Sequence, residues 1–129
     1  MTKEQYNKLS GQILDAALTV HKEMGPGLLE SVYESCLIQE LHLRNIRVKF
    51  QVFLPLFYKG VELNKDFRID ILVEDEIIIE VKALDIILAV HEAQIISYLK
   101  LADKKLGFLI NFNVPLIKDG FRRFINGYL

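Results

Sequence analysis

The chain has 129 residues, of which 51% are hydrophobic and 26% charged, a composition that excludes a disordered chain and suits one compact domain over residues 1–129. The formal net charge of −1 excludes nucleic-acid binding by bulk electrostatics alone, so any such contact must be local. The single cysteine, Cys36, excludes an internal disulfide and a cysteine metal cluster, which favours a reducing, cytoplasmic location.

The first third of the chain is predicted to form two helices. Apolar residues recur at helical spacing over residues 3–24, and charges run throughout this amphipathic segment, which predicts a helix that is neither a signal peptide nor a membrane span. Gly25 and Pro26 end it, because glycine suits a helix end and proline cannot continue the helix. A second helix follows from about Leu29 and fades near Arg44.

The rest of the chain is predicted to build a sheet. The pattern indicates strands at 46–58, 67–73, 77–82 and 106–113, a tight turn into a short strand at 58–63, a helix at 84–103 and a short closing helix at 118–129. The order α-α-β-β-β-α-β-α predicts an α/β fold with helices on both sides of a mixed sheet.

Three charged residues interrupt the hairpin formed by 67–73 and 77–82. Asp70 breaks the first apolar run, and Glu80 and Lys82 break the second. A charged side chain in such a place costs free energy unless it is paired, solvated or bound to a cation. Glu80 and Lys82 are two residues apart on one strand, so they share a face of the sheet.

The length of the hairpin turn decides whether Asp70 joins them. A two-residue turn leaves Asp70 on the face opposite Glu80. A three-residue turn, 74–76, pairs Val73 with Ile77 and places Asp70 directly across from Glu80, within about 5 Å at the Cβ atoms. We predict the three-residue turn because it leaves all its acids in solvent; a bulge elsewhere would change the register.

In that register two carboxylates and an ammonium converge. Two close carboxylates repel each other, and a divalent cation relieves the repulsion; oxygen ligands suit Mg²⁺ or Mn²⁺. Such an ion polarises a phosphoryl oxygen and activates water, while Lys82 could orient that water or stabilise developing charge. The plain alternative is a structural ion pair between a buried lysine and an acid, with no catalysis.

Two motifs resemble known families. Asp70, nine intervening residues, and then Glu80 and Lys82 one residue apart resemble the D…(D/E)xK signature of the PD-(D/E)xK nuclease-like superfamily. "GLLESVY", residues 27–33, resembles the signature of the bacterial GxxExxY family, which is assigned to that superfamily. "HEAQIISYL" and "LINFNVPLIKDGFRRFIN" are also similar to later segments of that family. The one departure is Ile69, which stands where the superfamily often has proline.

The resemblance implies a restriction-endonuclease-like core whose metal ligands are Asp70, Glu80 and Glu30, with Mg²⁺ or Mn²⁺ as cofactor. Glu30 lies in the first turn of the second helix, where the alternative is that it only favours the helix start through the dipole. Gln94 resembles an extra motif, a glutamine a few residues before an aromatic residue, and its amide would orient water or contact a phosphate.

Three further residues have plainer expected roles. Tyr33 is expected to pack in the core, and Gly27 to permit the turn between the helices. His91 shares a helical face with Gln94 and Tyr98, where a capping or partly buried histidine is the more frequent role.

The last thirty residues are locally basic, with six cations and two acids giving a net charge of +4. The candidate nucleic-acid contacts are Lys104, Lys105, Lys118, Arg122 and Arg123. Their alternative is a solvated helix face.

Two functions follow for the set Asp70, Glu80 and Lys82. The first is a metal-dependent nuclease that hydrolyses DNA or RNA; the alternative is a catalytically silent nuclease-fold module that binds nucleic acid or a partner protein. The intact set favours the first. The small size and the lack of a recognition domain lead us to expect a homodimer or a larger assembly, away from membranes.

Overall fold

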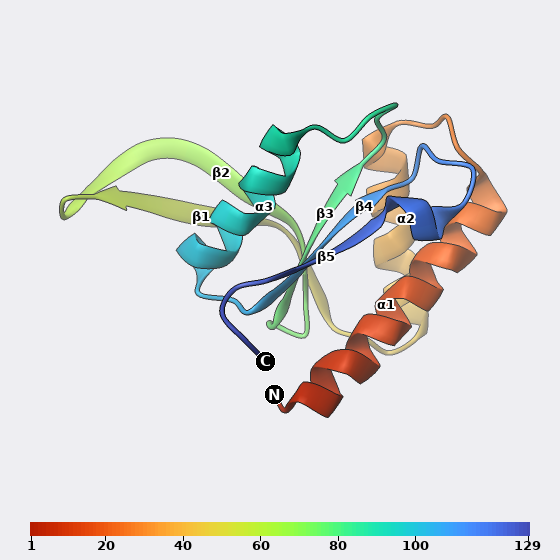
Figure 1. Cartoon of the computed structure of the whole chain (residues 1–129), viewed down its shortest axis with the longest axis horizontal. Helices are drawn as coiled ribbons and strands as arrows, with labels where there is room; N and C mark the ends of the chain where they lie inside the picture. Colours follow the sequence, from red (N-terminus) through yellow and green to blue (C-terminus); the bar gives the residue numbers. More distant parts are fainter.

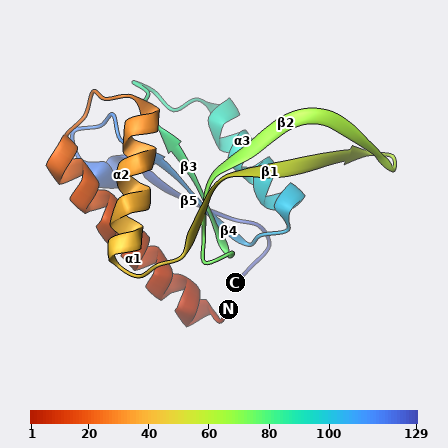
Figure 2. The same ribbon diagram turned by 180° about the vertical axis from the view of Figure 1, so that it is seen from behind.

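The chain folds into a mixed sheet with helices on both faces, as Figures 1 and 2 show from opposite sides. The computed structural model describes residues 1–63 and 67–129. The elements of this described part follow in the order α1 (Lys3–Met24), α2 (Glu30–Leu43), β1 (Val48–Tyr58), β2 (Val61–Val73), β3 (Ile77–Lys82), α3 (Ala89–Ala102), β4 (Leu106–Asn111), a short 3-10 helix (Ile117–Gly120) and β5 (Phe121–Ile125).

The strands lie side by side in chain order, β1 to β5. Among the described residues β3 and β4 form the one parallel pair, and the other neighbours are antiparallel. A parallel pair needs a crossover connection, which α3 provides between β3 and β4. This arrangement confirms the predicted α/β architecture.

The first helix begins and ends where its sequence predicts. The Thr2 hydroxyl accepts a hydrogen bond from the Gln5 backbone N–H at 3.1 Å, and the Gln5 side chain accepts one from the Thr2 N–H at 2.8 Å, which completes a capping box. At the other end Gly25 has a φ of 68°, a conformation that glycine adopts without strain.

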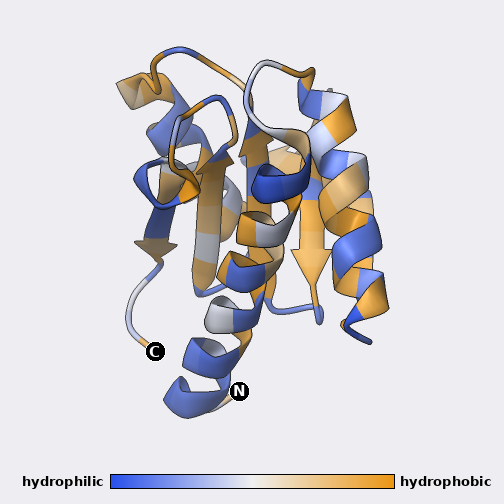
Figure 3. Cartoon of the chain, turned by 90° about the vertical axis from the view of Figure 1, so that its right-hand side faces the viewer, coloured by the Kyte–Doolittle hydropathy of each residue, from blue (hydrophilic) through white to orange (hydrophobic). Residues whose placement is uncertain are grey.

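Two hydrophobic layers hold the helices against the sheet. Alternate residues of β3 face opposite sides: Ile77 and Ile79 pack beneath α1 and α2, whereas Ile78 packs beneath α3. Figure 3 shows the hydropathy of these layers: the central strands are hydrophobic, whereas α1 carries both hydrophobic and hydrophilic residues. On the α2 side, the Tyr33 ring stacks on Phe112 with centroids 4.6 Å apart.

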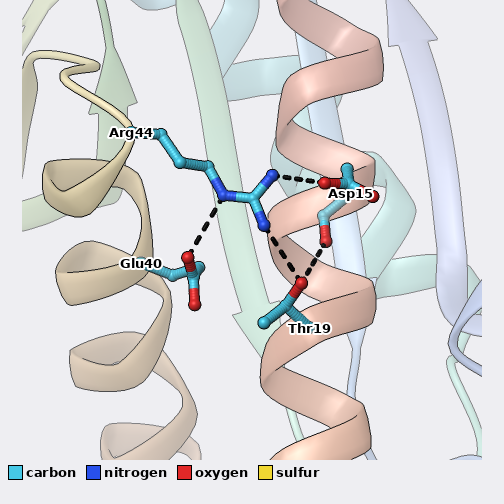
Figure 4. A network of polar contacts seen from close by, with 4 residues as sticks. All are labelled: Asp15, Thr19, Glu40 and Arg44. Carbon is cyan, nitrogen blue, oxygen red and sulfur yellow. Dashed lines mark hydrogen bonds and ion pairs between the residues drawn. The ribbon is translucent and has the colours of Figure 1, made fainter.

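Arg44, at the end of α2, ties that helix to α1 (Figure 4). Its guanidinium contacts Glu40 on its own helix at 3.2 Å, the Thr19 hydroxyl at 3.0 Å, and the Asp15 carboxylate. Because three of its nitrogens are engaged at once, Arg44 constrains how α2 lies beside α1. That placement matters because α2 carries Glu34, which contacts Gln51 on β1 of the sheet.

The β2–β3 turn has the predicted length. Val73 pairs with Ile77, and residues 74–76 form the loop, with Glu74 and Asp75 in left-handed conformations. The expectation that all its acids lie in solvent is wrong for two of them. Glu74 accepts hydrogen bonds from Arg47, and Glu76 accepts one from the Tyr6 hydroxyl at 3.0 Å.

The predicted closing helix at 118–129 is wrong. A four-residue 3-10 helix is followed by β5, which pairs with β4 from Leu106–Ile125 to Ile110–Phe121. Because β4 is buried along its whole length, its free edge needs a hydrogen-bonding partner, and this requirement overrides the local helical pattern.

Two other boundaries also differ from the prediction. The short strand near 61–63 and the strand at 67–73 belong to one strand, β2. The third helix begins at Ala89 rather than at residue 84. Both Leu84 backbone groups are bonded by the Asn111 side chain, so the chain after β3 is held extended before the helix can start.

Gly120 provides a test of this fold. A Cβ at Gly120 would lie 2.1 Å from the Asn111 carbonyl oxygen, so we expect Gly120→Ala to lower the free energy of unfolding by about 2–3 kcal/mol. Gly11→Ala is the matched control, because Gly11 is helical with open space around it and alanine should raise stability by about 1 kcal/mol. Urea denaturation measures both; similar effects for the two would contradict this packing.

Candidate active site

The polar site lies where β2 and β3 separate. Their ladder runs from Val73–Ile77 to Ile71–Ile79 and stops there. At the next position the Asp70 Oδ2 accepts a hydrogen bond from the Val81 backbone N–H at 2.9 Å, in place of a ladder carbonyl. The Asp70 N–H donates a long hydrogen bond to Glu80 Oε2 at 3.4 Å. The structure thus brings Asp70 and Glu80 together, as the three-residue turn predicted.

The strand changes face at Asp70. Ile71 and Val73 belong to the core beneath α1 and α2, whereas Ile69 belongs to the core beneath α3. In a regular strand residues 69 and 71 would share a face, so the twist is local to Asp70. This twist opens the β2–β3 ladder and leaves room for side chains in place of backbone pairing.

Burial keeps a proton on Glu80. The side chain is only 3% exposed, and this burial, followed by a hydrogen bond to Asp70 and the Asp70 charge, raises the pKa of Glu80 from 4.5 to about 10. The Lys82 charge acts in the opposite direction. In the absence of a cation, Glu80 therefore keeps its proton at neutral pH.

Gln51 and Glu34 extend the site beyond the predicted residues. The Gln51 amide donates hydrogen bonds to Glu34 Oε1 on α2 at 2.9 Å and to Asp70 Oδ1 at 3.5 Å. Burial raises the pKa of Glu34, the Gln51 hydrogen bond lowers it, and the charges of Asp70 and Glu30 raise it. Glu34 could have been found from sequence, because it lies one turn after Glu30 on the same helical face.

Gln51 has a backbone conformation that side chains rarely adopt. Its φ is 50°, in the left-handed region, although it lies within β1 between the pairs Phe50–Ile71 and Val52–Ile69. A non-glycine residue in this region is strained, and such strain concentrates at functional sites. Nothing in the local sequence predicts this conformation.

Glu30 is exposed at the first residue of α2. Among the described residues, no three His, Cys, Asp or Glu side chains are grouped so that they could hold a metal ion, so the predicted ligand set is not assembled. The pair Asp70 and Glu80 still fits a divalent cation: Mg²⁺ often takes only one or two carboxylates and keeps several waters. Burial contributes most to the raised pKa of Glu80, and the Asp70 charge, which also raises it, is the part that such a cation would offset.

Lys82 and the α3 residues complete the surroundings. Lys82 is half-buried, and within the described residues no hydrogen bond or ion pair engages its ammonium group. From α3, the Gln94 amide donates a hydrogen bond to the Tyr98 hydroxyl at 3.1 Å. The pKa of Tyr98 is raised by burial first and then by the charges of Glu80 and Asp70, so this helix faces the carboxylates.

Comparison with known proteins gives one match. A family model described as the PD-(D/E)XK nuclease superfamily matches residues 7–124. The chain belongs to this superfamily. No curated protein and no solved structure matches it. Its mixed sheet flanked by helices agrees with a restriction-endonuclease-like fold, and PD-(D/E)XK nucleases generally use divalent metal ions.

Tyr33 and His91 form local hydrogen bonds at the starts of helices in this PD-(D/E)XK chain. The Tyr33 hydroxyl donates to the Gly25 carbonyl at 2.5 Å and accepts from the Leu28 N–H at 3.1 Å, which fixes the turn before α2. His91 Nδ1 accepts from the Leu88 N–H at 2.9 Å, at the start of α3. Both contacts fit the plainer roles expected for these two residues.

The predicted basic residues do not gather on one face. Arg122 forms an ion pair with Glu92 on α3, whereas Arg123 donates to Asn7 on α1 at 3.3 Å, on the other side of the sheet. Lys104 and Lys105 precede Leu106, at the end of β4 away from Lys82, and Lys118 lies in the 3-10 helix. The structure does not assemble these five residues into one surface.

A groove of about 890 Å³ lies elsewhere on the molecule. It is lined by residues of the α2–β1 connection and of the β2–β3 turn, among them His42, Arg47 and Asp75. Neither Asp70 nor Glu80 lines it, so this groove is separate from the carboxylate pair. No helix of the described residues is long and apolar enough to cross a membrane.

The protonated Glu80 predicts how stability depends on pH. Because the folded-state pKa lies above the ordinary value of 4.5, the folded protein holds the proton longer, and this stabilisation is lost as the pH rises toward about 10. Metal-free protein should therefore lose up to about 1.4 kcal/mol of unfolding free energy per pH unit. In Glu80→Gln this loss should be absent, as urea denaturation in EDTA would show. Equal pH dependence in both proteins would contradict the assignment.

Proposed function

We propose that this protein is a metal-dependent nuclease whose active site is built on Asp70, Glu80 and Lys82. The observation that carries the proposal is the contact between buried Glu80 and half-buried Asp70 at the end of the β2–β3 ladder, with a lysine two residues after Glu80 on the same strand. Stability alone does not require such an arrangement, since apolar side chains would fill the same space at lower cost. Membership of the PD-(D/E)XK superfamily supports the chemistry.

Asp70 and Glu80 are the proposed ligands of a Mg²⁺ or Mn²⁺ ion. When bound, the ion would polarise a phosphoryl oxygen of the nucleic acid and lower the pKa of water. Glu80 would have to give up its proton for this binding, because a carboxylate must be ionised to ligate a metal. Asp70 stays oriented through the Val81 N–H, which leaves its other oxygen toward Gln51.

Lys82 is the proposed group that acts on the phosphate or on the attacking water. It shares the Glu80 face of β3, and no partner among the described residues competes for its ammonium group. A half-buried cation there would stabilise negative charge that develops on the phosphate. Gln94 is a weaker candidate for contact with water or phosphate, because its amide already binds the Tyr98 hydroxyl.

Glu34, on α2, is connected to this pair through Gln51, whose amide donates hydrogen bonds to both Glu34 and Asp70. We propose that it binds the ion directly or through water. The role of Glu30 as a ligand stays a prediction, as do the assignment to the bacterial GxxExxY family, the cytoplasmic location, and the choice between DNA and RNA.

The direct test is cleavage. Purified protein with Mg²⁺ or Mn²⁺ should cut at least one of single- or double-stranded DNA or RNA, and Lys82→Ala should lower the rate at least about 100-fold. Lys100→Ala is the matched control, because this exposed lysine on α3 has no place in the site. Equal cleavage by all three proteins would indicate a contaminant. Nucleic-acid binding without cleavage, in metal-loaded protein, would favour the silent module.

Metal binding can be tested apart from turnover. Mn²⁺ should raise the melting temperature of the wild type, and this shift should vanish in Asp70→Ala. Gln51→Gly should weaken Mn²⁺ binding about 10-fold, because it removes the amide that orients two carboxylates. Its stability should change little, since relief of the left-handed strain offsets the lost hydrogen bonds.

Lys59→Gly is the control for this last variant. Lys59 also has a left-handed φ, 49°, but lies in the β1–β2 turn away from the carboxylates. The same relief of strain should raise its stability and leave Mn²⁺ affinity unchanged. Equal Mn²⁺ affinity in Gln51→Gly and wild type, measured by calorimetry, would remove Gln51 from the site.

A further inference from the structure

Beyond Gln51, β1 and β2 leave the body of the protein as a two-stranded arm. The arm comprises residues 52–63 and 67–69 of the described chain, and Figures 1 and 2 show it projecting past α3. Lys59 and Gly60, both with positive φ, form the turn at its tip, between the paired residues Tyr58 and Val61. Isolated two-stranded ribbons are marginally stable in water, so an arm of this kind gains from further packing.

One face of the arm is covered and the other is open. Leu54 is buried in the core beneath α3, and Val52 and Phe67 pack against the same core. The residues that alternate with these on β1, namely Phe53, Pro55 and Phe57, are exposed. Their side chains therefore line the face that α3 does not cover.

Gln51 brings Phe50 onto the same open face. Phe50 pairs with Ile71, which faces the core of α1 and α2, whereas Val52 pairs with Ile69, which faces α3. The left-handed conformation of Gln51 lies at this reversal. Phe50, Phe53, Pro55 and Phe57 consequently form one apolar line along β1, called here the aromatic stripe. Across from it on β2, Arg68 pairs with Phe53 and Glu62 with Phe57, so charged residues border the stripe on that side.

The stripe exposes more apolar surface than isolated surface residues would. Phe50, Phe53 and Phe57 are 58%, 52% and 60% exposed, and Tyr58 at the tip is 61% exposed. At about 200 Å² for a whole aromatic residue, the three phenylalanines expose about 340 Å². Tyr58 is not counted, because it follows Phe57 in the strand and its side chain lies on the other face. The largest apolar patch of a typical soluble monomer measures about 300–600 Å² and is often functional.

This area is close to what a pair of copies needs. Two arms would bring together about 680 Å² of aromatic surface, to which the exposed Pro55 of each arm adds. The smaller stable interfaces bury about 1,200 Å² in all, of which about 65% is apolar in homodimers. The stripe thus supplies the apolar core of a symmetric interface, and polar residues at its border would supply the rest.

The charges around the arm favour a protein surface over a nucleic acid. At its base Arg47 is paired with Glu74 at 2.9 Å and Lys49 with Asp75 at 3.6 Å. At the tip, the Lys59 ammonium lies 5.5 Å from the centroid of the Tyr58 ring. Because these cations already have partners within the chain, they do not form a track for a phosphate backbone.

We propose that the aromatic stripe is the contact through which two copies of this chain associate. Pro55 has no N–H to donate and interrupts β1, which is the edge strand, so continuous pairing of strand edges between copies is disfavoured. The copies instead pack stripe against stripe about a two-fold axis, which closes the assembly at a dimer. Phe50 directly precedes Gln51 and Phe53 lies two residues after it, so this interface borders the carboxylate site.

Sedimentation equilibrium measures association and not catalysis. The dimer proposal can therefore fail or succeed independently of the proposed nuclease activity. Wild-type protein should be a dimer at micromolar concentration. The double variant Phe53→Ser, Phe57→Ser should dissociate, with a dimer dissociation constant raised at least about 30-fold. The control is Leu29→Ser, Ile86→Ser, which changes exposed apolar residues outside the arm and should leave the dimer intact. A monomeric wild type, or equal dissociation in both variants, would overturn the proposal.

A crosslinking experiment covers the case in which the double variant does not fold. In a Cys36→Ser background, Pro55→Cys places one thiol in the middle of the stripe, close to its counterpart in a stripe-to-stripe pair. Mild oxidation should convert most of the protein to covalent dimers. Ser97→Cys, an exposed position on α3, is the control and should stay monomeric. Equal crosslinking at both positions, or none at Pro55→Cys, would overturn the proposal, as would crosslinking that requires added single-stranded DNA or RNA.

Discussion

The contact between Asp70 and Glu80 is the constraint on which the site depends. Two carboxylates lie where the β2–β3 ladder stops, and one of them is almost fully buried. Backbone groups freed by the twist are satisfied by these side chains: Val81 donates to Asp70, and Asp70 donates to Glu80. Without a cation the pair is tolerated only because Glu80 keeps its proton. The repulsion between the two carboxylates can therefore be relieved in two ways, by a proton on Glu80 or by a metal ion.

The surrounding elements are arranged to bring further polar groups to this pair. Arg44 and Tyr33 position α2 at its two ends, one through α1 and the other through the turn at Gly25. This placement carries Glu34 toward the sheet, where Gln51 connects it to Asp70. On the opposite side the pKa of Tyr98 is raised by burial first and then by Glu80 and Asp70, so side chains from α2, β1 and α3 interact with this pair.

Gln51 links the site with the arm. Its left-handed backbone directs an amide toward Asp70 and Glu34, and the same reversal puts Phe50 and Phe53 on one open face. A single strained residue thus has two consequences, one for the orientation of the carboxylates and one for the aromatic stripe. The proposed dimer contact and the carboxylate site would then lie next to each other on β1.

The sequence by itself determined the parts of this protein that depend on local spacing and chain geometry. The extent of the first helix follows from its periodicity, and the juxtaposition of Asp70 with Glu80 follows from the alternation of side chains in a strand once the turn has three residues. Only the tertiary structure decided the rest. β5 replaced a predicted helix because the buried β4 edge needs a partner, and Glu34 and Gln51 joined the site because residues distant in sequence meet there. Hydrogen bonds and left-handed strain that arise between elements leave no periodic signal in the chain, which is why local patterns did not reveal them.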